Sequence, residues 1–250
     1  MSLLVAVACS ASVAQAGSPM TGPLSVKMSL ATGQTVSLGE PIVIHYGLSN
    51  TLTGEHLILS RGALPDDWYT ISLTGGSGQA VKSIASRHTR RSSGLFQDKE
   101  VGIMHGGKAE GSIIVPTYRT LTRPGKYTLY IHVKQPYVSE PDAPIDVDPA
   151  THFSLDQNYM LPVTITAANP SLLRNTAERL RLEAESPLYS GSSSSAVEAL
   201  FSMPENPALA SWQLLISDPH VPERVLQEAV NQLTRLHSVV AVDLLTDVTQ

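Results

Sequence analysis

The sequence predicts an α+β protein in two segregated parts, an antiparallel β-sandwich followed by a short array of helical hairpins. Up to about residue 167, apolar and polar residues alternate in short runs that are separated by turn residues, which is typical of antiparallel sheets. Beyond that point, apolar residues recur every three or four positions, as they do along a helix that buries one face. The 250 residues are enough for two such parts, each with its own hydrophobic core.

Residues 1–16 are predicted to be a signal peptide. Residues 3–8 form a short apolar run, and Ala14-Gln15-Ala16 has the A-x-A pattern of a cleavage site. This pattern predicts a protein that is exported to the periplasm or the cell exterior, and a disordered tail is the alternative. The one cysteine, Cys9, lies inside this segment, so the mature chain would hold no thiol. A lipid anchor at Cys9 is a further alternative, which the small Ala6 before it does not favour.

The predicted sandwich covers residues 23–167. Its first strand places Leu24, Val26 and Met28 on one face, with polar residues between them. The clearest strand follows the turn residues Pro124 and Gly125. The proline-rich residues 137–158 predict a loop. The further strands are expected at residues 42–48, 56–59, 68–73, 111–115, 126–134 and 159–166.

The predicted helical part covers residues 169–250. Asn169 can cap a helix that starts at Pro170, and Pro187 ends that helix. The serine-rich residues 190–195 predict a linker. Two helix pairs are then expected, residues 196–203 with 207–216 and residues 222–236 with 239–248.

Residues 36–50 and 121–133, with their turn residues and apolar alternation, resemble bacterial immunoglobulin-like or fibronectin-type modules. That resemblance implies a sandwich fold and no particular activity. The helical pairs are similar to HEAT repeats, which implies a stacked array that presents a surface to other proteins. The matching positions are Ala196 and Leu200 with Ala229 and Leu233, and Leu214-Leu215 with Leu244-Leu245.

Charge and motifs restrict the classes of function. Residues 17–167 hold 12 basic and 12 acidic residues, whereas residues 168–250 hold 5 basic and 10 acidic ones. A nucleic-acid partner is not expected, because the chain lacks a basic stripe. There is no apolar run long enough to cross a membrane and no nucleophile elbow, phosphate-binding loop or paired-histidine zinc motif. We therefore expect a non-catalytic interaction protein without a cofactor, whose partner is an unidentified protein.

Two clusters of charge are the candidate partner-binding residues. Arg87, Arg90 and Arg91 form a basic run that could hold a carboxylate or phosphate of a partner. Glu223 and Glu228 lie on the acidic helical part and could meet a basic surface. The alternative for the arginine run is a solvated loop.

The alternative function is a calcium- or glycan-binding sandwich. Asp142, Asp146 and Asp148 could supply oxygen ligands to calcium, although a solvated loop has the same composition. Trp68 could stack on a sugar, although a strand tryptophan is more often part of a core.

His45 and His132 are a weaker metal candidate. They would form a pair only if their strands were neighbours, and the alternative is two surface histidines.

Overall fold

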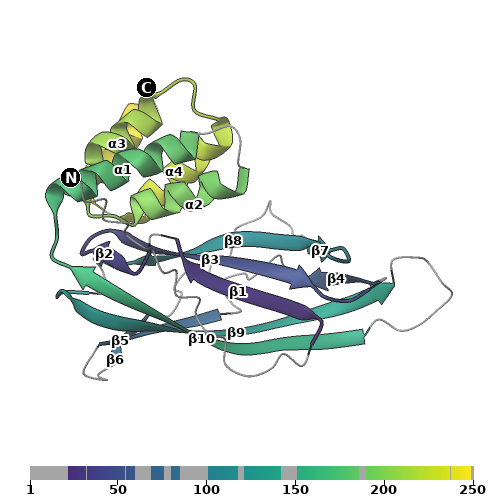
Figure 1. Ribbon diagram of the computed structural model, residues 1–250. Coiled ribbons are helices and arrows are strands. Elements are labelled where there is room, and N and C mark those ends of the chain that lie inside the picture. The colour runs from purple at the N-terminus through teal and green to yellow at the C-terminus, as the bar shows by residue number, and fades with distance from the viewer. Residues whose placement is uncertain are drawn as a thin grey trace, which may run out of the picture.

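The computed structural model places strands in the N-terminal part and five helices in the C-terminal part (Figure 1). The predicted α+β architecture in two segregated parts is therefore confirmed. The structure describes residues 22–31, 33–53, 55–59, 69–75, 80–84, 101–117, 121–141, 151–185, 190–236 and 238–248.

The smaller sheet has the strand order β1-β3-β8 and is antiparallel throughout. Its strands are β1 (Leu24–Leu30), β3 (Pro41–Asn50) and β8 (Lys108–Pro116). Alternate residues of these strands are buried, so one face of the sheet is apolar.

The larger sheet has the order β2-β10-β9-β4-β7. In addition, β5 pairs with β9 and with β6. Every pairing is antiparallel except that of β2 with β10, which is parallel and departs from the prediction. The strands are β2 (Thr35–Ser37), β4 (Glu55–Leu59), β5 (Tyr69–Gly75), β6 (Ala80–Ile84), β7 (Val101–Ile103), β9 (Gly125–Pro141) and β10 (Thr151–Thr166).

The two sheets pack face to face and share one hydrophobic core (Figure 1). Ile44 and Ile113 come from the smaller sheet, and Leu129 and Leu161 from the larger one. Asn50 is buried at the end of β3. Its Nδ2 donates to the carbonyls of Glu55 at 2.8 Å and Ile103 at 3.0 Å. These bonds satisfy the buried amide and hold β4 and β7 in place.

The loop predicted for residues 137–158 is wrong over much of its length, because β9 continues to Pro141 and β10 starts at Thr151. Tyr137 and Phe153 pair across the two strands, and their rings stack with centroids 5.3 Å apart. Such cross-strand aromatic pairs stabilise a sheet. Pro136 is tolerated because it lies where the pairing of β9 with β5 ends and its pairing with β4 begins.

The helices form two layers, in which α1, α3 and α5 lie side by side and α2 contacts α4. The linker predicted for residues 190–195 is wrong, because α2 begins at Ser190. Serine has an intermediate helix propensity, which tertiary context can override. The helices are α1 (Pro170–Glu185), α2 (Ser190–Phe201), α3 (Glu205–Ser217), α4 (Glu223–Leu236) and α5 (Val239–Val248).

The helical core is centred on Trp212, which is fully buried and stacks on Phe201 at 5.0 Å between ring centroids. Its indole nitrogen donates to the carbonyl of Leu200 at 3.2 Å. Ile114, on the outward face of β8, packs against this core, and α2 contacts both β8 and β3. The helices therefore cover one end of the smaller sheet (Figure 1). None of the helices in the described ranges is long and apolar enough to cross a membrane.

Candidate functional site

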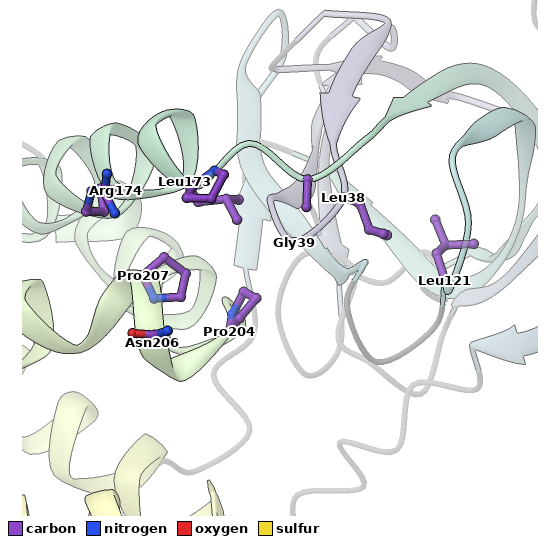
Figure 2. Close-up of a pocket in the computed structure, with 10 residues that line it drawn as sticks. Leu38, Gly39, Leu121, Leu173, Arg174, Pro204, Asn206 and Pro207 are labelled. Carbon is purple, nitrogen blue, oxygen red and sulfur yellow. The ribbon is translucent and has the colours of Figure 1, made fainter.

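The candidate site is a cleft between the sandwich and the helical part, which we call the junction cleft. Its volume is about 370 Å³, which is within the usual range for ligand pockets. Both parts of the chain contribute to it (Figure 2). The lining includes Leu38, Gly39 and Leu121 from the sandwich, Leu173 and Arg174 from α1, and Pro204, Asn206 and Pro207 at the start of α3.

The sandwich wall of the cleft is the tight turn between β2 and β3. The backbone N–H of Glu40 donates to the carbonyl of Ser37 at 2.9 Å and closes the turn. Gly39 has a φ of 106°, which L side chains rarely adopt. A Cβ at this position would lie 3.1 Å from Leu173 Cδ1 and 3.2 Å from Pro204 Cγ. Only glycine therefore allows both the turn and the close approach of the helices.

Four polar side chains, Ser37, Glu40, Thr117 and Thr176, connect this turn to the helical part. We call them the junction clamp. Glu40 accepts hydrogen bonds from the backbone N–H of Ser37 at 2.7 Å and from the hydroxyl of Thr176 in α1. Thr117 accepts from the N–H of Gly39 at 3.0 Å and donates to the carbonyl of Glu40 at 2.6 Å.

Ser37, Thr117 and Thr176 are buried, and burial makes the loss of a polar partner costly. Ser37 Oγ also donates to the carbonyl of Ala167 and accepts from the N–H of Asn169, both at 3.2 Å. The clamp therefore fixes how the sandwich meets α1, so the cleft is preformed.

The helical wall of the cleft is made where α1 and α3 begin (Figure 2). Asn169 caps α1, because its Oδ1 accepts from the N–H groups of Ser171 at 3.1 Å and Leu172 at 3.2 Å. Pro204 precedes α3 and provides no side-chain cap. Prolines at the starts of both helices give this wall a rigid apolar surface.

The polar groups of the cleft lie at its helical end. Arg174 is exposed and is the charged residue among the lining residues of the described part. Its Nη2 lies 3.5 Å from Ser171 Oγ, which is the outer limit of a hydrogen bond. Leu121 lies at the other end of the lining (Figure 2). The cleft can thus hold an apolar group beside a charged or polar one.

The predicted partner-binding residues that the structure describes do not belong to this cleft. Glu223 is exposed in the first turn of α4, and Glu228 is half-buried and accepts from Gln232 Nε2 at 2.8 Å. Neither of them lines the cleft. The other predicted residues lie outside the described ranges, namely Arg87, Arg90, Arg91, Asp142, Asp146, Asp148 and Trp68.

His45 and His132 do not form the metal pair that neighbouring strands would have allowed, because the two residues lie in different sheets. His132 Nε2 is 2.9 Å from Asp156 Oδ1 on the larger sheet. His45 Nδ1 is 2.8 Å from Ser112 Oγ on the smaller one. Among the residues that the structure describes, no group of three or more His, Cys, Asp or Glu side chains could hold a metal ion.

The contact of His45 with Ser112 is the arrangement of a nucleophile beside a base, which the sequence did not indicate. The hydrogen bond is exposed, and neither residue lines the junction cleft. A nucleophile needs in addition a third group that orients the base and a site that holds the reacting atom. The pair therefore offers no substrate site in the described part of the chain.

Comparisons with known proteins assign no family. No family model matches the chain, and no curated protein does. Three weakly similar solved structures are a β-glucosidase from Listeria innocua, the alkylpurine DNA glycosylase AlkC from Pseudomonas fluorescens and a PapD-like domain of human CEP192.

The sequence identities are 10%, 13% and 15%, and the TM-scores are 0.27, 0.29 and 0.29, respectively. The alignments cover 58%, 59% and 63% of this chain. They span 16% of the glucosidase, 32% of the glycosylase and 98% of the PapD-like domain. At these TM-scores, none of the three similarities supports an argument about function.

Proposed function

We propose that the protein is an exported, non-catalytic interaction protein that holds a segment of a partner protein in the junction cleft. The observation that carries this proposal is the cleft itself, an apolar hollow that both parts of the chain line and that the junction clamp holds in shape. A preformed site loses little conformational entropy when it binds, so little of the interaction energy is lost to ordering.

The distribution of exposed apolar side chains favours a protein as the partner. Every large exposed hydrophobic side chain described in the helical part lies in the layer of α1, α3 and α5. A contiguous apolar surface on this layer would fit a contact with another protein, whereas apolar side chains exposed singly would not require one. Leu172 stands next to the cleft residues Leu173 and Arg174, so the apolar layer begins at the cleft. The side chains are Leu172, Leu182, Leu214, Val239 and Val242.

The proposal is tested by capture from the exported fraction of the source cells, with the full chain as bait. Asn206→Trp fills the cleft from an exposed position in the first turn of α3. Gln227→Trp introduces the same side chain at an exposed position of α4, away from the cleft. We expect a partner that the unchanged chain and Gln227→Trp retain and that Asn206→Trp loses by tenfold or more.

Equal retention by all three baits would refute a role for the cleft. Both variants are first compared with the unchanged chain by circular dichroism and thermal unfolding, so that a loss of capture is not a loss of fold.

A further inference from the structure

We infer that the junction cleft selects a partner segment in which an apolar side chain lies beside a carboxylate. This inference rests on the proposed function and names the chemistry that the cleft recognises. Two observations support it, namely that one arginine of α1 lacks an ion pair with any described residue and that the lining of the cleft is mostly apolar.

The three arginines of α1 differ in their partners. Arg179 pairs with Glu183 at 3.3 Å. Arg181 pairs with Glu178 at 2.7 Å and also with Glu185. Arg174, the one that reaches the cleft, forms no ion pair with a described residue. Its guanidinium therefore keeps most of its five donors available for a ligand.

A guanidinium fits a carboxylate better than it fits a neutral group, because two parallel N–H donors meet the two oxygens. The lining is mostly apolar, with Leu173, Pro204 and Pro207 on the helical side with Arg174, and Leu38 farther away on the sandwich side (Figure 2). An aliphatic side chain entering this hollow would place an adjoining carboxylate toward Arg174. The cleft can thus recognise an aliphatic side chain and a carboxylate that lie on adjacent residues or on the same residue.

The surrounding charge makes this recognition local. Residues 168–250 are acidic overall, which opposes an anion at long range. Salt screens charges that are more than about 8 Å apart under physiological conditions, whereas a direct hydrogen-bonded pair keeps its strength. Glu205 starts α3 beside Pro204 and forms no ion pair with Arg174.

The carboxylate has two sources in a protein. The last residue of a chain carries its side chain and its terminal carboxylate on one Cα, and an internal aspartate or glutamate can stand beside an apolar residue. Three small probes separate these sources. They are acetyl-Leu-Leu with a free carboxylate, the same peptide as its amide, and acetyl-Glu-Leu as its amide.

The experiment is an NMR titration of the full chain that follows the backbone amides of Gly39, Arg174 and Asn206. We expect the free acid to bind at least tenfold more tightly than acetyl-Leu-Leu amide. Arg174→Ala should reduce the affinity for the acid to that for the amide. The control, Arg179→Ala, removes an exposed arginine of the same helix and should keep the preference.

Acetyl-Glu-Leu amide then identifies the source. Binding as tight as that of the acid supports an internal acidic residue, and binding as weak as that of the neutral amide supports a chain terminus. Equal affinity for acid and neutral amide, a preference that survives Arg174→Ala, or no shift with any probe would overturn the inference. The proposed function is judged separately, by the loss of capture in Asn206→Trp.

Discussion

Gly39 combines two constraints, a positive φ and a close approach of the helices. We expect Gly39→Ala to lower the free energy of unfolding by about 2–4 kcal/mol, because the new methyl group adds a clash to the backbone strain. Urea denaturation of the purified chain measures this loss.

The matched control is Gly33→Ala. Gly33 has a φ of 76°, and a Cβ placed there would have no described atom within 4 Å, so this substitution isolates the backbone cost. That cost is about 1–2 kcal/mol. An equal loss in both variants would mean that the approach of Leu173 and Pro204 contributes nothing.

Tyr159 is buried in the sandwich, and burial raises the pKa of its phenol to about 12. The folded state therefore keeps this proton at a pH where the unfolded chain, with a pKa of about 10, has lost it. The stability that protonated Tyr159 contributes is fully present below pH 10 and is lost as the pH rises toward 12. Within this range, stability falls by about 1.4 kcal/mol per pH unit on account of this group.

Tyr159→Phe should remove that part of the pH dependence. At neutral pH, the variant loses only the hydrogen bond that the hydroxyl donates to Gln157, which is worth about 1 kcal/mol. Denaturant unfolding of both proteins at pH 8, 10 and 11 measures the cost of the lost hydrogen bond and the change of stability per pH unit. Parallel curves for the two proteins above pH 10 would show that Tyr159 does not titrate differently in the folded state.

At the scale of elements, the hydrogen bond between Glu40 and Thr176 connects the turn after β2 to α1. A double-mutant cycle with Glu40→Gln and Thr176→Val should give a coupling free energy of about 1–2 kcal/mol, because the acceptor is charged and the hydroxyl is buried. Additive losses in the double variant would mean that the clamp does not couple the two parts.

The elements with a clean period were predictable from the sequence. Alternation placed β1, and Asn169 with Pro170 placed the start of α1, which the structure confirms. Residues 126–134 and 159–166 were predicted as strands, but the extensions of β9 and β10 into the predicted loop were missed. Pro136 and Pro141 favour a loop locally, whereas tertiary pairing tolerates them. The start of α2 was missed because a serine run has the same composition in a linker and in a first helical turn.

The candidate site was not predictable in the same way. Gly39 gives no signal of its role in the cleft, because nothing near it in the sequence shows that Leu173 and Pro204 approach it. Arg174 looks like any exposed helix residue until its neighbours Arg179 and Arg181 are seen to be paired. Long-range packing determines both the approach of the helices to Gly39 and the ion pairing of the α1 arginines. A single sequence does not reveal such packing.

At the scale of the whole molecule, the export part of the proposal makes a prediction of its own. Removal of residues 1–16 would leave a chain that starts at Gly17. Intact mass measurement and N-terminal sequencing of the protein from its source cells should find that start. A retained segment, or a lipid on Cys9, would contradict cleavage after Ala16.

From the place of β10 we expect a particular order of folding. This strand lies between β2 and β9, yet it is the last strand of the sandwich in the chain. Ser37 bonds to Ala167, 130 residues away, so the sandwich depends on contacts that form slowly. The helices need mainly neighbours in sequence and can form early. The junction cleft would then be completed last, and a chain that can bind is one whose folding has finished.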